Sequence, residues 1–540
     1  MSDRLQVEAH KAFAAIDARV SFHSGSRGRV WNEAPVGDLQ ASALRLAAVL
    51  RGGLSQPFVL LALENSPELV LGVLACIQTG ISFAVLSPER ARGILAEIGR
   101  SNALPFPTAI LCDAKDRPVT TPCRVIETEE IDALVAAAES ALAVAPDPSS
   151  LAYFQLTSGS SGALKAVPVT HGMLAANINA VAARTGYGSD DRTVLFIPLC
   201  HDMGLVTFLG SLMLGGSALI LETASFIRNP MSWLNHVSEF RATTSAIPNF
   251  ALRATQRLAK IRRVELDLSS VRRIWIGGEP VFPDNLLGFE ATFAGHGLAG
   301  GAMRPSYGLA EAVVKVSTSR LSQPVTILAV ARHSLVPGTE IEVLNDPWSS
   351  HNETVVKYVS NGHPLDNVAL EIWGDKGSLP ELRLGRIMIR GETICAAYYG
   401  RPSDLENGWR DTGDLGFLHE GEIFIVGRRK DVIIRGGINY SAEQLEQVAE
   451  VSLGDKARRI AAFSVIDHKA ERERIHILCE SRRDEDEIRA AVVKVLTGAI
   501  GIAPDLVLIV PPGTIPVTTS GKIRRQELRE RYSDVHRIGT

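Results

Sequence analysis

The sequence predicts an α/β fold in which a large N-terminal domain, made of two α/β subdomains plus a β-rich subdomain, precedes a small C-terminal α+β domain. The chain has 540 residues, too many for one hydrophobic core. Helical and strand-like stretches alternate through its first half, and short strands separated by turns follow from about residue 337. The order of these patterns indicates layered α/β subdomains first and a β-rich part after them.

The first α/β subdomain is predicted within residues 1–150. Two stretches in it are helical, and two are short apolar runs typical of buried strands. The helical stretches are 39–50 and 67–80, and the strand-like runs are 58–63 and 81–86. Alternation of this kind is typical of a largely parallel sheet covered by helices.

The second α/β subdomain repeats this alternation beyond residue 170. Helices are predicted at 173–185 and 204–214, and strands at 193–197, 217–221 and 274–276. The stretch 204–221 is uncharged and just long enough to span a membrane, but Gly215 and Gly216 divide it. We therefore predict a buried helix followed by a buried strand, and no membrane span.

The β-rich subdomain and the C-terminal domain meet at a charged string. Strands are predicted at 340–344, 368–373, 385–390 and 421–426, and helices at 441–451 and 484–496. Four of the five residues in 427–431 are charged, which makes this segment a poor part of a core. We therefore place the boundary there, with an N-terminal domain of residues 1–429 and a C-terminal domain of residues 430–540.

The overall composition excludes several classes of partner. The formal net charge is -4, and a chain in which neither sign dominates is not expected to bind nucleic acid or an anionic membrane. The six cysteines include no CxxC pair, which argues against a zinc site or a disulfide framework and fits a reducing cytosol. The N-terminal segment lacks the apolar region of a signal peptide, so we expect a cytoplasmic protein.

One short loop lies between two strand-like runs, residues 151–156 and 166–170. Its glycines, hydroxyl groups and terminal lysine are suited to holding phosphate. The candidate phosphate-binding residues are Thr157, Ser158, Gly159, Ser160, Ser161, Gly162 and Lys165. A P-loop would need Gly at position 164 and Ser or Thr after the lysine, where this chain has Leu and Ala. We therefore expect the loop to join two strands, and an ordinary surface loop is the alternative.

Two further strings follow predicted strands, where side chains face the ligand crevice of an α/β sheet. His201 and Asp202 form the first, although either residue alone is more often structural. The second consists of Gly277, Gly278, Glu279 and Pro280. Its glycines would let a flat purine lie against the backbone, and a plain turn is the alternative.

Three more strings add aromatic, acidic and basic groups. The first contains Ser306, Tyr307, Gly308 and Glu311. It supplies an aromatic face for a base and a carboxylate for Mg²⁺, which prefers oxygen ligands. Asp414 offers a carboxylate that could accept both hydroxyls of a ribose. Lys522 lies on a glycine turn near the C-terminus, and it reaches a site in the large domain only if the small domain folds over that site.

These strings resemble the motifs of the adenylate-forming superfamily, which includes acyl- and aryl-CoA synthetases, adenylation domains and luciferases. Six motifs occur in the order of that superfamily over nearly the whole chain. The chain is most similar to the fatty acyl-AMP ligases, which load acyl groups onto acyl carrier proteins. This similarity rests on the strings at His201–Leu205, Ala246–Phe250, Gly278–Val281, Arg304–Ala312 and Gly513–Lys522.

The resemblance implies roles for individual residues. It assigns the loop of residues 157–165 to the phosphates of ATP, Tyr307 to adenine, Glu311 to Mg²⁺ and Asp414 to ribose. Further cofactor-binding positions are Gly278, Glu279, Pro280, Ser306, Gly308 and Arg428, the last to ribose or phosphate. Lys430 would be the hinge of a mobile C-terminal domain. Lys522 would bridge the carboxylate substrate and the α-phosphate, and His201 and Glu311 complete the implied catalytic set.

The loop departs from the pattern of the superfamily at three positions. Ser161 replaces the usual threonine, Leu164 the usual proline and Ala166 the usual glycine. Hydrogen-bond donors and Lys165 are retained, so we expect altered loop dynamics and a retained phosphate site.

The implied reaction is ATP-dependent activation of a carboxylic acid to acyl-AMP, followed by transfer to the phosphopantetheine thiol of a carrier protein in a secondary-metabolite or lipid pathway. The alternatives are an acyl- or aryl-CoA ligase, transfer of the acyl group to an amine or another nucleophile, and a non-catalytic nucleotide sensor. The last is disfavoured because Lys165, Glu311, Asp414 and Lys522 are all present.

Two expectations concern the acyl group and its acceptor. His201, Phe250 and Gly277 are expected near the acyl group, whose identity the sequence does not define. Residues 322–357 resemble an extra segment of the acyl-AMP ligases. We expect this segment to pack between the large and small domains and to oppose the arrangement that a CoA ligase needs.

Overall fold

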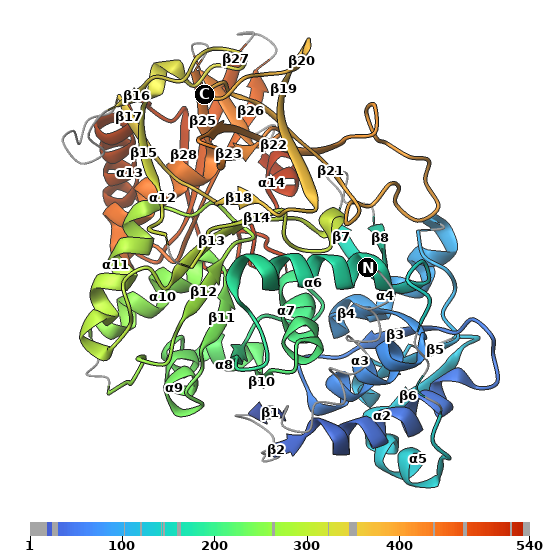
Figure 1. Ribbon diagram of the computed structural model, residues 1–540. Coiled ribbons are helices and arrows are strands. Elements are labelled where there is room, and N and C mark those ends of the chain that lie inside the picture. The colour runs from blue at the N-terminus through green and yellow to red at the C-terminus, as the bar shows by residue number, and fades with distance from the viewer. Residues whose placement is uncertain are drawn as a thin grey trace. The chain divides into compact units, whose positions relative to one another are not determined.

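The computed structural model describes residues 19–23, 31–101, 103–118, 121–141, 143, 146–158, 164–261, 265–321, 323–344, 354–435, 438–467, 472–518 and 521–532. The chain divides into two compact units (Figure 1). The first consists of residues 1–325, 362–369 and 390–410, and the second of residues 326–361, 370–389 and 411–540.

A six-stranded sheet forms the first layer system of the first unit. Its order is β6 (Arg124–Glu127), β5 (Ala109–Cys112), β3 (Phe58–Ala62), β4 (Ser82–Leu86), β7 (Leu151–Ser158) and β8 (Leu164–Thr170). The pairs from β6 to β7 are parallel, whereas β7 and β8 form an antiparallel hairpin. All residues of β3 are buried, which explains its continuous apolar run.

A nine-stranded sheet forms the second layer system. Its order is β18 (His363–Pro364), β14 (Ser317–Thr318), β13 (Met303–Tyr307), β12 (Arg273–Ile276), β11 (Thr244–Ile247), β9 (Arg192–Leu195), β10 (Ser217–Leu221), β1 (Arg19–His23) and β2 (Trp31–Pro35). The strands from β13 to β1 pair in parallel, and antiparallel strands close both edges. The two predicted α/β subdomains are therefore confirmed. The bounds of the first differ from the predicted residues 1–150, because β1 and β2 join the second sheet and β7 and β8 belong to the first.

Helices cover both sheets of the first unit (Figure 1). They are α2 (Val36–Arg51), α3 (Pro67–Thr79), α4 (Pro88–Ser101), α5 (Ile131–Ala137), α6 (His171–Thr185), α7 (Asp202–Met213), α8 (Thr223–Arg228), α9 (Met231–Glu239), α10 (Asn249–Ala259) and α11 (Pro283–Phe293). Local signals set their ends: α3 begins at the Ser66 cap with Pro67 in its first turn and ends at Gly80, whose φ is 67°. The stretch 204–221 is a buried helix and a buried strand, as predicted.

The second unit begins with small β-sheets. A five-stranded sheet has the order β20 (Gly377–Ser378), β19 (Val368–Gly374), β21 (Gly385–Gly391), β22 (Arg410–His419) and β23 (Glu422–Arg428), and a three-stranded sheet the order β16 (Val343–Leu344), β15 (Ile327–Ala331) and β17 (Val355–Val359). The strand predicted at 340–344 is shorter than expected. Glu340 makes an isolated bridge to Arg383 instead, and only the last two residues pair as β16.

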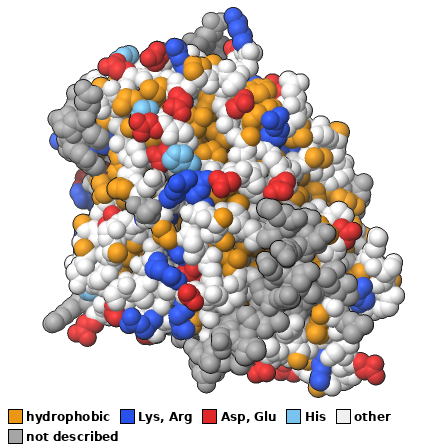
Figure 2. All heavy atoms as spheres, in the orientation of Figure 1, with side chains coloured by type: hydrophobic (Ala, Val, Ile, Leu, Met, Phe, Trp, Pro, Cys, Tyr) orange, Lys and Arg blue, Asp and Glu red, His pale blue; other side chains and the backbone are white. Residues whose placement is uncertain are grey.

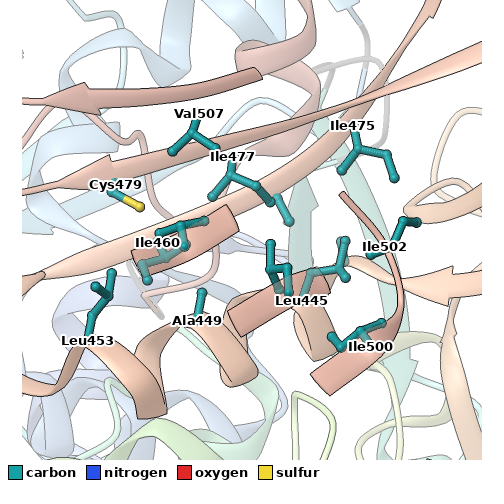
Figure 3. Close-up of a cluster of buried hydrophobic side chains, with 14 of the residues drawn as sticks. Leu445, Ala449, Leu453, Ile460, Ile475, Ile477, Cys479, Ile500, Ile502 and Val507 are labelled. Carbon is teal, nitrogen blue, oxygen red and sulfur yellow. The ribbon is translucent and has the colours of Figure 1, made fainter. Parts of the chain in front are cut away.

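The C-terminal part of the second unit has its own core. The helices are α12 (Ala442–Leu453), α13 (Glu485–Ile500) and α14 (Arg525–Tyr532), and the strands are β24 (Val432–Arg435), β25 (Ile438–Ser441), β26 (Arg459–Asp467), β27 (Arg472–Glu480) and β28 (Leu506–Val510). Apolar side chains of α12 and α13 pack on the β26–β27–β28 sheet (Figure 3). This is the predicted α+β part, and the boundary at residues 429 and 430 stays a prediction.

Three features of the structure bear on the expectations drawn from the composition. On the face shown in Figure 2, acidic and basic side chains are interspersed. All six cysteines lie in the described part of the chain and are free thiols. No helix in the described part combines the length and the apolar character that crossing a membrane requires.

Candidate active site

The β7–β8 hairpin carries the candidate phosphate-binding loop. Thr157 and Ser158 end β7 and pair with Lys165 and Leu164 at the start of β8. The prediction that the loop joins two strands is confirmed, and a P-loop is excluded because the lysine lies in a strand and α6 begins only at His171. The predicted phosphate ligands Gly159, Ser160, Ser161 and Gly162 lie outside the described residues.

Lys165 and Glu311 contact the same tyrosine, Tyr398. The Lys165 ammonium lies 4.4 Å from the centre of the Tyr398 ring, and the Tyr398 hydroxyl donates a 2.5 Å hydrogen bond to Glu311 Oε1. Burial and the neighbouring Glu311 carboxylate raise the pKa of Tyr398, so the hydroxyl keeps its proton and stays a donor. The structure thus brings together the candidate phosphate lysine and the candidate metal carboxylate.

The backbone around Glu311 is folded into a tight turn. Val313 has φ 66° and ψ -65°, and Val314 N donates to Ala312 O at 2.8 Å, which makes this a strained γ-turn. Asn177 of α6 holds the turn by donating from Nδ2 to Ala312 O and Lys315 O. A Cβ on Gly308 would meet Val314 O at 1.6 Å, so only glycine fits there. The strain is stored beside the candidate catalytic carboxylate.

Ser306 and Tyr307 form the end of β13. The Ser306 hydroxyl shares a 2.8 Å hydrogen bond with Thr318 Oγ1, and Tyr307 pairs with Ser317. Tyr307 is largely buried. Both residues therefore lie at the carboxyl end of a parallel strand, where α/β sheets bind ligands.

The Gly277–Pro280 string lies beside Ser306 at the carboxyl end of β12. A Cβ on Gly277 would come within 3.0 Å of Ser306 O, and Gly278 has φ 79°. The Glu279 carboxylate accepts a 2.5 Å hydrogen bond from Phe250 N, the second residue of α10. Glu279 therefore stabilises a helix N-terminus, a structural role that the sequence did not indicate. Its role in cofactor binding, like that of Gly278 and Pro280, stays a prediction.

His201 lies at the N-cap position of α7. Gln155 of β7 donates from Nε2 to Cys200 O at 2.9 Å, which ties the segment before His201 to the phosphate hairpin. Asn65 fixes the same segment, donating to Ile197 O and accepting from Leu199 N. The position of His201 therefore depends on Gln155 of β7, which lies two residues before the phosphate-binding loop begins.

Tyr398→Phe should separate the hydroxyl of this tyrosine from its ring. The ring would still contact Lys165, but Glu311 would lose a charge-assisted hydrogen bond worth about 1.5–3 kcal/mol, and we expect a roughly 10-fold higher Mg²⁺ concentration for half-maximal pyrophosphate exchange. The matched control is Tyr399→Phe, because Tyr399 makes its contacts through its backbone and its ring. An unchanged Mg²⁺ dependence would mean that the hydroxyl does not position Glu311.

Asp414 and Arg428 are paired in the second unit. They face each other on β22 and β23, and Arg428 Nε lies 3.0 Å from Asp414 Oδ1. Asp414 is 6 % exposed, whereas the Arg428 side chain is half exposed. The structure therefore joins these two predicted nucleotide ligands, with the carboxylate oriented by the guanidinium.

Asp414→Ala should weaken ATP binding by about 10- to 100-fold, because each charge-assisted hydrogen bond to ribose is worth roughly 1.5–3 kcal/mol. Calorimetric titration with ATP measures this. Asp411→Ala is the control: Asp411 lies three residues earlier on β22 and pairs with Arg386 and Arg429. Equal ATP affinity of the Asp414 variant and the intact protein would place the ribose contact elsewhere.

Lys430 and Lys522 are exposed residues of the second unit. Lys522 N donates to Thr518 Oγ1 at 3.1 Å, and Thr518 N donates to Lys522 O at 2.7 Å, so the lysine lies on a tight turn with Gly521 at φ 85°. Arg529 of α14 donates to Lys430 O at 3.0 Å. The predicted turn is confirmed, and the roles of both lysines stay predictions.

Tyr398 and Asn177 are residues of the candidate site that the sequence did not single out. Tyr398 lies 87 positions after Glu311, so only the fold shows their contact. The Tyr398–Tyr399 pair before a glycine was a visible aromatic signal. Asn177 gave no signal, because a lone amide in a helical pattern is usually exposed.

Comparison with known proteins identifies the class of this fold and site. The model of the AMP-binding enzyme family matches residues 31–399. The medium-chain-fatty-acid–[acyl-carrier-protein] ligase JamA of Moorena producens (strain JHB) is 32% identical over 406 residues, covering 71% of this chain and 68% of that protein. The long-chain-fatty-acid–AMP ligase FadD32 of Mycobacterium marinum (strain ATCC BAA-535 / M) is 32% identical over 483 residues, covering 78% and 74%.

Solved structures agree with this class. A chain from a study of fatty acyl-adenylate ligases from E. coli and L. pneumophila matches with a TM-score of 0.84 and 27% identity, covering 99% of this chain and 98% of that one. The fold is that of the adenylate-forming enzymes. The chain belongs to the AMP-binding enzyme family, and it is an enzyme of the ligase type.

Proposed function

We propose that this ligase uses ATP to convert a carboxylic acid to acyl-AMP and then transfers the acyl group to the phosphopantetheine thiol of a carrier protein. The observation that carries the first step is the cluster of Lys165, Tyr398 and Glu311 at the end of the β7–β8 hairpin. A named acyl-carrier-protein ligase and a named fatty-acid–AMP ligase among the relatives support a fatty acid and a carrier protein.

The residues divide the chemistry between them. A carboxylate oxygen of the substrate attacks the α-phosphorus, and the bond to the bridging oxygen breaks as pyrophosphate leaves. Lys165 binds the departing phosphates, and Asp414 and Arg428 hold the ribose. Lys522 donates to the attacking carboxylate and the α-phosphate while negative charge gathers there. The thiol sulfur then attacks the acyl carbon, and AMP leaves.

Glu311 fits a magnesium ion. Mg²⁺ is usually bound by one or two carboxylates plus substrate phosphates, and no cluster of three or more metal-ligating side chains occurs in the described ranges. One oxygen of Glu311 accepts from the Tyr398 hydroxyl, and the ring of the same tyrosine contacts the phosphate lysine. When bound, Mg²⁺ would offset the charge of the pyrophosphate leaving group.

The segment of residues 322–357 bears on the choice of acceptor. Its described part packs against residues 439–444, which belong to the predicted C-terminal domain. Asn439 donates from Nδ2 to Leu335 O at 2.9 Å, and Arg332 donates to Gln444 Oε1 at 3.3 Å. These contacts support the proposal that the segment restrains the C-terminal domain and so favours a thiol carried on a long flexible arm over free CoA.

Removing both contacts should therefore change the acceptor and not the activation step. We expect the double variant Arg332→Ala, Asn439→Ala to form acyl-CoA roughly 10-fold faster, because two hydrogen bonds of about 1 kcal/mol each restrain the domain. Pyrophosphate exchange should stay nearly constant. Arg383→Ala is the control, since Arg383 pairs with Glu340 and not with residues 439–444.

The test of the proposed function is a pyrophosphate-exchange screen over acids from acetate to palmitate, with aromatic acids included. Thioester yield is then measured with CoA and with a holo carrier protein. If none of the tested acids supports pyrophosphate exchange, the proposed activation step is contradicted. Efficient acylation of CoA by the intact protein, unaltered in the double variant, would favour the CoA ligase, an activity that also occurs in the names of relatives.

A further inference from the structure

A buried lysine packs against a tryptophan of the nine-stranded sheet. Lys315 is 7 % exposed, and its ammonium lies 3.2 Å from the centre of the Trp275 ring, which is 2 % exposed. Tyr187 packs edge-on against the same tryptophan. A lysine is rarely buried without a charged partner, so this position needs a reason.

The charges around Lys315 do not balance. Asp191 is fully buried and contacts two guanidinium groups, Arg273 at 2.7 Å and Arg272 at 2.8 Å. Among the described residues, Lys315 has no ion pair and no hydrogen bond from its ammonium. Burial and the charge of Arg273 lower its pKa well below the usual value. The Asp191 carboxylate is thus shared by two guanidinium groups, and the lysine has no carboxylate of its own among the described residues.

Neighbouring donors in this cluster also lack partners. Trp275 Nε1 and Arg273 Nε are buried and make no hydrogen bond with any described residue. Buried donors are normally paired. Two orphaned N–H groups beside an unpaired lysine indicate that a group rich in acceptor oxygens binds here.

Trp275 connects Lys315 with Gly277, one of the residues expected near the acyl group. Arg273 and Trp275 alternate along β12, so their side chains lie on one face of the sheet, and Gly277 directly follows Ile276, the last residue of the strand. Gly277 lies about 6–7 Å beyond Trp275 along the chain, at two residues of strand rise. Arg273 donates to Thr244 on the same face. Because Lys315 packs on Trp275, an acid that has its reacting carboxylate at Gly277 and lies along β12 would bring its other end to Lys315.

We propose that Lys315 binds a second carboxylate at the far end of the substrate, and hence that the enzyme activates a short dicarboxylic acid. This inference rests on the proposed function. The second carboxylate stabilises the protonated form of the Lys315 ammonium and accepts from the orphaned donors. Trp275 closes the apolar wall along which the methylene chain lies. A monocarboxylic acid of the same length leaves the buried lysine unpaired and is bound less well.

Pyrophosphate exchange with length-matched pairs of acids tests this: glutarate against pentanoate and adipate against hexanoate. We expect the intact enzyme to prefer a dicarboxylate by at least about 10-fold in kcat/KM. Lys315→Met should lower kcat/KM for it by about 100-fold, mainly through KM, and should raise it for the monocarboxylate. Lys315→Arg should retain the preference. Lys260→Met, at an exposed lysine after α10, is the control.

The results separate the inference from the proposed function. Equal preference in the intact enzyme and in Lys315→Met, or a preference of the intact enzyme for the monocarboxylate, would overturn the inference and leave acid activation in place. If no acid supports exchange, adipate binding is measured by calorimetry. Binding that is lost in Lys315→Met would support the carboxylate contact without the proposed function, and absence of binding to the intact protein would overturn it. If Lys315→Met does not fold, the preference of the intact enzyme and of Lys315→Arg decides.

Discussion

Lys522→Ala is expected to lower the rate of acyl-AMP formation by about 100-fold or more, because a positioned cationic donor acts where negative charge develops. The same variant should consume chemically supplied acyl-AMP at nearly the normal rate in the presence of holo carrier protein. This follows because the lysine contacts the α-phosphate only while the adenylate forms. The two half-reactions are measured separately, by pyrophosphate exchange and by thioester yield.

Lys494→Ala is the matched control, since Lys494 is an exposed lysine of α13 in the same unit. It removes the same charge from the second unit and should leave both half-reactions unchanged. An equal loss of both half-reactions in Lys522→Ala would contradict the proposed role, because it would point to a general defect of the C-terminal part.

Arg525→Met should destabilise the C-terminal part by about 3–5 kcal/mol, the effect of breaking a buried ion pair by removing one partner. Arg525 begins α14 and is buried. Its guanidinium donates to both oxygens of Glu446 at 2.8 and 2.7 Å and lies 2.8 Å from Glu443. Without it, the buried Glu446 carboxylate loses its cationic partner and keeps the hydrogen bond from Ala462 N.

Hydrogen exchange of α12 and β26 measures this loss locally, because exchange of core amides reports local opening. The double variant Arg525→Met, Glu446→Leu should regain most of the protection, because an apolar pair of similar size avoids the uncompensated charge. Arg524→Met is the control, since the neighbouring Arg524 is more than half exposed. Protection in Arg525→Met equal to that of the intact protein would contradict a stabilising role.

The secondary structure could be predicted where residues close together in the sequence determine it. The run 58–63 is apolar throughout and forms β3, buried on both faces, and Ser66, Pro67 and Gly80 mark the ends of α3. The strand predicted at 340–344 is shorter in the structure, because strand pairing depends on a partner from elsewhere in the chain. Glu340 forms an isolated bridge to Arg383 and is not part of a strand.

The candidate site was predicted in part. Lys165, Tyr307, Glu311 and Asp414 lie in short strings whose residue types match a nucleotide, so they could be found without the fold. Tyr398 could not, because its role depends on a contact between segments that are far apart in the sequence. The strained γ-turn at Val313 could not be predicted either, because a β-branched residue such as valine rarely adopts a positive φ.

The arginines that follow Lys522 have a mechanical consequence. Arg525 lies 3.9 Å from Asp431, and Arg529 contacts both Asp431 and the carbonyl of Lys430. The backbone just after the predicted hinge is therefore fastened to the helix that begins three residues beyond Lys522. Rotation at Lys430 would then move Lys522 together with α14 as one rigid body. A small change in one backbone angle could withdraw the lysine without any unfolding of the turn that carries it.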